Sequence, residues 1–292
     1  MYAAISGLEA SQTMLDVTAN NLANSDTIGY KSASTSFVDE LSQTLAPPTG
    51  PNGFSGGTNA QQVGLGVQVG AIENNMNTGS LQTTGNPLDV AIQGAGFFQV
   101  GNGNPGNTAP YTSNLPSNVE YSRAGNFTLN ANGFLTTQNG EYVVGSTLPS
   151  SSASAVPTYI NVPPGSTNVA VGQDGAVSYT DENPTDPTYG QTVISGYISL
   201  ATFPNPSGLQ RMGNSTWDRS PASGPLSGAV QTATPGLNGL GTTISGSLEM
   251  SNVDMATEFT NMITAERTYQ ANSKVITTGD TMLSTLVNMV QG

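Results

Sequence analysis

The sequence lacks histidine and cysteine, and it has few basic residues. Its 292 residues include 19 acids but only six Lys or Arg, giving a formal net charge of −13. Phosphate binding requires a cluster of basic side chains, so nucleic acid is not an expected partner. Without histidine or cysteine there is no imidazole base, no thiolate nucleophile, no metal site built on these ligands and no disulfide. Carboxylates, Ser, Tyr and the six bases remain, which is a poor set of groups for catalysis, and we expect no catalytic residues, no cofactor, no metal site and no enzymatic activity.

Long apolar runs are also missing. No segment approaches the roughly 18 consecutive apolar residues of a membrane-spanning helix, so we expect no membrane insertion. The first ten residues contain neither the basic segment nor the apolar core of a cleaved secretory signal. The absence of cysteine suits a protein that leaves the cytoplasm. These features predict that, if exported, the chain leaves without signal cleavage.

The N-terminal segment carries a heptad pattern. From Met1 to Leu22 the seam residues alternate spacings of four and three, and most of them are apolar, as in a coiled-coil helix. The run 20–30 is rich in Asn, Ser, Asp and Gly, which favour caps and turns. A second apolar set, between Phe37 and Leu45, precedes two prolines that stop any helix. We assign 1–46 to an N-terminal helical segment.

The C-terminal segment, 251–292, carries the same pattern for longer. The four-three alternation runs from Met255 to Val290, and Ser251 or Asp254 can cap the helix. A second apolar stripe, from Ile263 to Met289, lies beside the first. Two stripes indicate more than one neighbour, so we expect packing into a larger bundle or a stack of identical chains.

The middle of the chain reads as β-structure. Short stretches alternate apolar and polar residues, and Asn132-Gly133 and Asp174-Gly175 are hairpin signals between such stretches. We expect a linker or extended stretch over 47–75 and a β-rich domain over 76–250. The predicted class is α+β, in which paired N- and C-terminal coiled-coil helices flank an inserted, mainly antiparallel β domain.

Three features of this middle region are candidate sites of chemistry. Gly94-Ala95-Gly96 is followed by a strand pattern, which favours a tight turn over a phosphate loop. The acids Asp181, Glu182 and Asp186 lack the spacing of a calcium loop and the aromatic cleft of a glycosidase, so a solvated loop is favoured. Trp217 is most simply a buried anchor.

The helical segments hold the candidate assembly residues. Asn20 and Asn21 either cap a helix end or fix register with neighbouring subunits, and Glu266 and Asp280 in the C-terminal seam either face solvent or do the same. We assign the assembly interface to the two Asn residues and the apolar seams: Ile5, Leu8, Leu15, Leu22, Asn20, Asn21, Met255, Phe259, Met262, Tyr269, Ile276, Leu283 and Val287.

Four motifs, in order along the chain, resemble one known family. They are ISGLEASQTMLDVTANNLANSDTIGYKS, NPLDVAIQGAGFFQV, YSRAGNFTLNANGFL and SLEMSNVDMATEFTNMITAERTYQANSKVITTGDTML. Together they resemble the flagellar basal-body rod and hook proteins of bacteria. The resemblance implies a chain exported by the flagellar apparatus without signal cleavage. It also implies a helical tube lined by the terminal axial helices.

The resemblance is stronger to hook proteins, which form a flexible tube that transmits torque from rod to filament; the distal rod is the alternative. It implies a homo-polymer whose partners are rod proteins, hook-filament junction proteins, the hook cap and the export apparatus, located in the bacterial flagellum. From other classes, a secreted β-rich adhesin or tube protein and a carbohydrate-active enzyme remain alternatives. Glycan binding by a monomer would favour the first, and polysaccharide hydrolysis that depends on Asp181 or Asp186 would favour the second.

Overall fold

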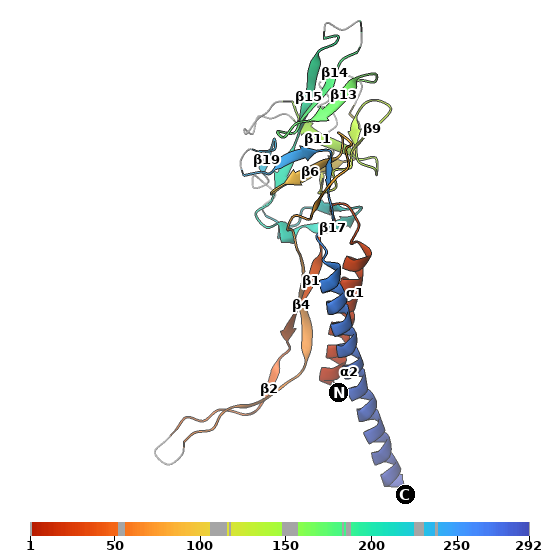
Figure 1. The fold of residues 1–292 in the computed structure, drawn as a ribbon. Helices are drawn as coiled ribbons and strands as arrows, with labels where there is room; N and C mark the ends of the chain where they lie inside the picture. The colour runs from red at the N-terminus through yellow and green to blue at the C-terminus, as the bar shows by residue number, and fades with distance from the viewer. Residues whose placement is uncertain are drawn as a thin grey trace. The chain divides into compact units, whose positions relative to one another are not determined.

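The computed structural model describes residues 2–51, 56–105, 116, 118–147, 157–182, 184, 188–224, 231–236 and 239–291. The chain divides into two compact units. The first unit spans Met1–Ser25, Ser32–Asn75 and Val253–Gly292, and the second spans Asp26–Lys31 and Met76–Asn252. Helices near both ends of the chain and a mainly antiparallel β region between them give an α+β fold, as predicted (Figure 1).

The first unit contains two antiparallel helices, α1 (Tyr2–Ala23) and α2 (Met255–Gln291). Asn21 Nδ2 donates to Glu258 Oε1 over 3.0 Å, while Gly7 faces the Asn272 side chain, and these two contacts fix the antiparallel register. Asp254 caps α2, because its Oδ1 accepts from the backbone N–H groups of Ala256 and Thr257. The capping prediction is thus resolved in favour of Asp254.

Four strands of the first unit form a paired arm. β1 (Ala33–Asp39) is antiparallel to β4 (Val67–Asn74), and β2 (Ser42–Ala46) is antiparallel to β3 (Gln61–Gly64). The structure differs here from the expected helical segment 1–46, since α1 ends at Ala23 and the second apolar set lies in β1 and β2. Within 33–46, the β-branched and aromatic residues Thr35, Phe37, Val38 and Thr44 favour strands, and pairing with 61–74 satisfies the backbone groups.

The second unit is built on a large sheet. Its longest path runs β13-β14-β15-β11-β7-β8-β18-β17, and two-stranded pairs β20-β6 and β21-β5 accompany it. The strands of this unit are β5 (Leu81–Thr83), β6 (Val90–Gln93), β7 (Phe97–Gly101), β8 (Glu120–Ser122), β9 (Thr128–Leu129), β10 (Leu135–Thr136), β11 (Tyr142–Ser146), β12 (Pro157–Tyr159), β13 (Thr167–Val171), β14 (Ala176–Thr180), β15 (Thr192–Ile198), β16 (Leu200–Thr202), β17 (Gln210–Gly213), β18 (Thr216–Asp218), β19 (Gln231–Ala233), β20 (Thr242–Ser245) and β21 (Ser247–Glu249), with a short 3-10 helix, η1 (Pro206–Gly208).

The turns of this sheet follow the sequence signals. Gly133 and Gly175 have φ angles of 82° and 75°, and they join β9 to β10 and β13 to β14 as predicted. Gly94 and Gly96, at 114° and 136°, form the turn between β6 and β7, which confirms the interpretation as a turn.

Two apolar clusters form the core of the second unit. The larger cluster includes Phe98 and Phe127, whose rings meet edge to face at 5.0 Å. The smaller cluster includes Phe97, Phe203 and Trp217, and Trp217 is only 3% exposed. The prediction that Trp217 is a buried anchor is therefore confirmed.

Candidate assembly surfaces and the buried charge cluster

The apolar side chains of α2 are largely exposed within the chain. We call this set the α2 apolar face, and its exposed fractions range from 40% for Tyr269 to 83% for Val290. A soluble chain rarely leaves so many large apolar side chains in water, so this face is a candidate contact surface. Its members are Met255, Phe259, Ile263, Tyr269, Val275, Met282, Leu283, Leu286, Val287, Met289 and Val290.

Among the residues that the structure describes, no helix lies beside the last turns of α2. In the register set by the two interhelix contacts, Tyr2 at the start of α1 lies opposite Thr277 of α2. Residues 280–290 therefore extend past α1, and all of them are exposed. Burial of a Leu or Val side chain stabilises by about 1.5–3 kcal/mol, so contact with another chain would stabilise this end of α2.

The buried side of α1 is a row of small and polar residues. Its buried positions include Gly7, Ser11, Thr18 and Asn21, at alternating heptad spacings. A Cβ added at Gly7 would lie 2.6 Å from Asn272 Nδ2, so a larger residue there would require the Asn272 side chain to move. The two helices can thus approach closely through small side chains. The adjacent apolar seam of α1 is therefore only partly buried within the chain.

The predicted seam residues accordingly divide by exposure. Ile5 is 44% exposed, whereas Leu8, Leu15 and Leu22 are half-buried. On α2, Met262 and Ile276 are half-buried, and the other seam residues belong to the exposed α2 apolar face: Met255, Phe259, Tyr269, Leu283 and Val287. Their contact with other copies remains a prediction.

Asn20 and Asn21 lie in different environments. Asn20 is exposed near the helix end, where its carbonyl and its side-chain oxygen accept from Asn24 Nδ2. Asn21 is 1% exposed, and its amide donates to the Ala33 carbonyl and accepts from the Ala33 N–H at 3.0 Å. Asn21 therefore fastens the end of α1 to the start of β1 and to Glu258 of α2.

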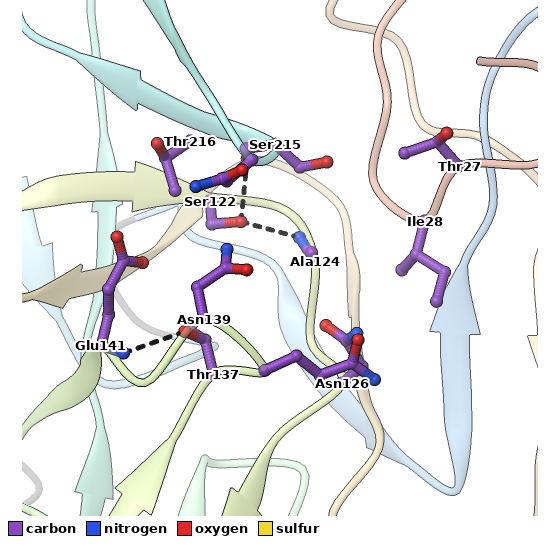
Figure 2. Close-up of a pocket in the computed structure, with 12 residues that line it drawn as sticks. Thr27, Ile28, Ser122, Ala124, Asn126, Thr137, Asn139, Glu141, Ser215 and Thr216 are labelled. Atoms are coloured by element: carbon purple, nitrogen blue, oxygen red, sulfur yellow. Dashed lines mark hydrogen bonds between the residues drawn. The ribbon is translucent and has the colours of Figure 1, made fainter. Parts of the chain in front are cut away.

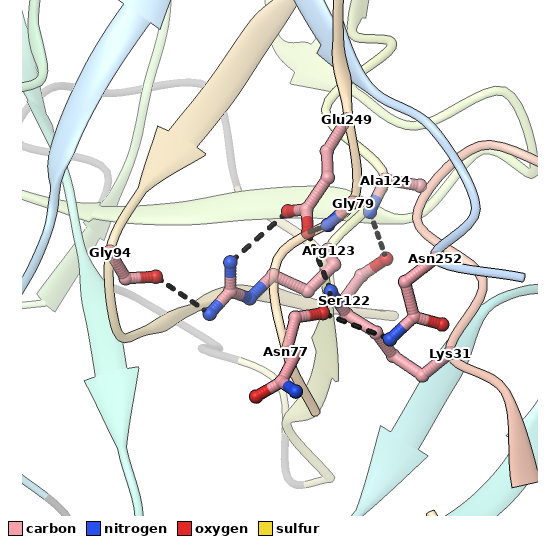
Figure 3. A network of polar contacts seen from close by, with 9 residues as sticks. All are labelled: Lys31, Asn77, Gly79, Gly94, Ser122, Arg123, Ala124, Glu249 and Asn252. Atoms are coloured by element: carbon pink, nitrogen blue, oxygen red, sulfur yellow. Dashed lines mark hydrogen bonds and ion pairs between the residues drawn. The ribbon is translucent and has the colours of Figure 1, made fainter. Parts of the chain in front are cut away.

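A cluster of three charged residues is buried in the second unit (Figure 3). Glu249 Oε1 lies 2.5 Å from Lys31 Nζ, and Glu249 Oε2 lies 3.1 Å from Arg123 Nη1. The side chains of Lys31 and Glu249 are 0% exposed and that of Arg123 is 4% exposed. We call these three residues the charge cluster. Backbone groups complete it, because Lys31 donates to the Asn77 carbonyl and Gly79 N–H donates to Glu249.

The charge cluster joins the two segments by which the chain enters and leaves the second unit. Lys31 belongs to the entering segment, 26–31, and Glu249 ends β21 at the exit. Gly29 N–H also donates to the Glu249 carbonyl over 2.8 Å. Burial lowers the pKa of Lys31 and the pKa of Arg123, while the Glu249 carboxylate opposes both shifts.

Arg211 is held between two aromatic rings beside this segment. Its guanidinium lies 4.7 Å from the centroid of the Tyr30 ring and 4.9 Å from that of Trp217, and it donates to the Lys31 carbonyl. A planar guanidinium suits such stacking better than an ammonium. Three of the chain's six bases are therefore occupied in ordering the second unit.

A polar cavity of about 250 Å³ lies near Glu141 (Figure 2). Hydroxyl and amide side chains dominate its lining, among them Ser122, Thr137 and Asn139. Glu141 is 8% exposed, and its Oε2 has no hydrogen-bond partner in the described part of the chain. Burial, with a smaller contribution from Glu120, raises the pKa of Glu141 above its usual value.

The acids considered for metal binding do not gather. Asp181 accepts from Thr188 over 2.7 Å and Glu182 from Thr167 over 2.8 Å, while Asp186 lies outside the described residues. The expectation of a solvated loop is wrong for Asp181, which is 5% exposed, whereas Glu182 is exposed. Among the residues that the structure describes, no group of acids is arranged to hold a metal ion. Neither described helix combines the length and apolar content needed to cross a bilayer.

Exposed apolar helices joined to a β unit with its own core define a class of protein built to associate with other chains. Known families match along the sequence. Residues 1–31 match the family described as flagella basal body rod protein, 91–179 the flagellar hook protein FlgE/F/G D1 domain, and 244–289 the flagellar basal body rod FlgEFG protein C-terminal.

Individual relatives match over nearly the whole chain. The flagellar basal-body rod protein FlgG of Bacillus subtilis is 39% identical over 99% of this chain and 98% of its own length. The protein of the same name from Agrobacterium fabrum is 38% identical over 96% and 95%. The flagellar hook protein FlgE of Borreliella burgdorferi is 25% identical over 99% of both chains.

The chain therefore belongs to the flagellar basal-body rod and hook protein family. Its members are structural components of the bacterial flagellum and not enzymes.

Sequence reasoning missed the charge cluster and the inward row of α1. No local pattern marks Lys31, Arg123 and Glu249, because they come from distant parts of the chain. The row of Gly7, Ser11 and Thr18 does carry a signal, since small residues recur there at heptad spacing, but the stronger apolar pattern one position later obscured it.

Proposed function

We propose that this chain is a subunit of the flagellar distal rod, which it forms by polymerising with further copies of itself. One observation carries the proposal: relatives named as basal-body rod proteins align with this chain over nearly their full length. The Bacillus subtilis relative aligns over 292 residues, the length of this chain. The two chains thus correspond nearly from end to end without a large insertion in either.

The hook, which the sequence resemblance favoured, is the second candidate. Its support is the hook protein FlgE of Borreliella burgdorferi, but that alignment extends over 443 positions at 25% identity. Such a length means that large insertions separate the hook relative from this chain. The rod relatives need none, and this difference favours the rod.

The exposed helices supply the physical basis for polymerisation. In the proposed polymer, the α2 apolar face and the apolar seam of α1 pack against helices of neighbouring copies in the manner of a coiled coil. Its further partners are the adjoining rod and hook proteins and the export apparatus, and the chain is exported without signal cleavage. The hook cap and hook-filament junction proteins are partners only in the hook alternative.

Electron microscopy of basal bodies from a strain lacking this chain distinguishes the two candidates. A truncated rod without a hook is the result expected for a distal rod subunit, and re-expression of the chain restores its length. An intact rod that lacks the curved segment would instead identify a hook subunit and overturn the proposal.

A further inference from the structure

A second cavity, of about 370 Å³, is lined by one basic residue, Arg123. Arg123 and Phe97 line it and are buried, and the Arg123 guanidinium lies 5.1 Å from the centroid of the Phe97 ring. Thr78 and Ala95 are exposed at its edge, and Thr202 is half-buried. The cavity therefore leads from solvent to a buried cation.

The charge cluster beneath this cavity is not electrically balanced. It contains two cations, Lys31 and Arg123, and one carboxylate, Glu249, so the described side chains leave one positive charge in excess. Glu249 carries a single negative charge, which both cations share, and its oxygens also accept from Gly79 N–H. A buried charge without a counter-charge is costly, and an anion nearby would remove that cost.

One N–H donor of Arg123 has no hydrogen-bond partner in the described part of the chain. Nη1 donates to Glu249 and Nη2 to the Gly94 carbonyl, but Nε has no partner in the described part of the chain. Burial lowers the pKa of Arg123 despite the neighbouring carboxylate, which agrees with incomplete compensation. Guanidinium groups form strong charge-assisted hydrogen bonds with carboxylates, and the hydroxyls of Thr78 and Thr202 are additional donors.

We propose that this cavity binds a carboxylate, and that in the polymer an acidic side chain of a second copy supplies it. This inference rests on the proposed function, since it requires neighbouring copies. The chain's own composition favours that source, because its 19 acids far outnumber its six bases. Acidic side chains on an adjacent subunit are held at high effective concentration.

The test places a carboxylate at the cavity within the same chain. Thr78 lies in an exposed loop, so Thr78→Glu can occupy the site, and Thr78→Gln is a control of equal size without charge. We expect Thr78→Glu to raise the Tm of the full-length monomer relative to Thr78→Gln. We also expect it to raise the critical concentration for assembly about tenfold, as loss of one charge-assisted contact would.

A control variant and a crosslinking experiment separate this effect from others. Gln173→Glu adds an acid at an exposed turn of the same unit, and it should leave the critical concentration near that of the wild type. The chain has no cysteine, so a photo-crosslinker attached to Thr78→Cys labels only this site. In the polymer it should join a second copy at a peptide that contains Asp or Glu.

Each outcome decides a part of the inference. Equal Tm values for Thr78→Glu and Thr78→Gln would overturn the carboxylate site. A higher Tm with unchanged assembly and no crosslink between copies would mean that only a free small anion binds, which overturns the second copy as occupant. Failure of the wild-type chain to assemble would contradict the proposed function, while the Tm comparison still judges the site.

Discussion

Lys31 Nζ lies 2.5 Å from Glu249 Oε1, although the two residues are 218 positions apart in the chain. The pair holds the entrance of the second unit to its exit, and neither side chain reaches solvent. Breaking a buried pair on one side leaves an uncompensated charge, which costs more than the pair itself contributes. The integrity of the second unit thus depends on a contact that only its folded chain creates.

Glu249→Gln should strongly destabilise the second unit. The substitution leaves two buried cations without a carboxylate, so we expect the free energy of unfolding to fall by about 3–5 kcal/mol. Denaturant unfolding followed by the fluorescence of the single Trp, Trp217, measures this directly. The exposed Glu182→Gln serves as a control and should change stability by less than about 0.5 kcal/mol. A similar effect of both substitutions would contradict the role of the charge cluster.

Glu141→Gln should stabilise the chain at neutral pH and not under acid conditions. Burial raises the pKa of Glu141 in the folded chain above the usual 4.5, so the folded chain binds more protons than the unfolded chain in the interval above that value. Wild-type stability from this group is present below pH 4.5 and is lost as pH rises through the folded pKa. The stability difference between variant and wild type should therefore grow above pH 4.5, as measured by thermal unfolding across pH. A difference that does not change with pH would refute this explanation.

Gly7 and Asn272 should behave as a coupled pair. Gly7→Ala places a methyl group against Asn272 Nδ2 and should loosen the helix pair, although alanine is the better helix former. Asn272→Ala opens the space, so the double variant should recover stability, with a coupling energy of about 0.5–3 kcal/mol. Circular dichroism at the helix band follows the transition. Additive effects of the two substitutions would show that the helices do not meet there.

Leu283→Asp should block assembly without unfolding the monomer. Leu283 is 52% exposed within the chain and lies beyond the end of α1, so the charge costs little until another chain covers it. Sedimentation of assembled material should show loss of polymer, while the Tm of the monomer stays near the wild-type value. Ile276→Asp, at a half-buried seam position, should lower both.

Thr285→Asp is the matched control for this helix, because Thr285 is exposed but polar. It should assemble nearly as the wild type does. Normal assembly of Leu283→Asp would remove the α2 apolar face from the proposed interface.

The sequence by itself determined the two terminal helices, the turn-rich β region between them and the absence of histidine and cysteine chemistry. These features are local: heptad spacing sets a helix, Asn132-Gly133 and Asp174-Gly175 set hairpins, and composition sets the available side chains. The motifs also sufficed to recognise the family. They did not distinguish rod from hook, since that difference lies in what is inserted rather than in the shared segments.

Only the tertiary structure decided which residues of each helix are buried and which contacts the few basic residues make. Residues 33–46 became strands because the distant segment 61–74 pairs with them, and strand pairing depends on such partners more than on local preference. Lys31, Arg123 and Glu249 meet because the entering segment, the sheet and β21 converge. Electrostatic energy depends on distance in space and on burial, and neither quantity can be read along a chain.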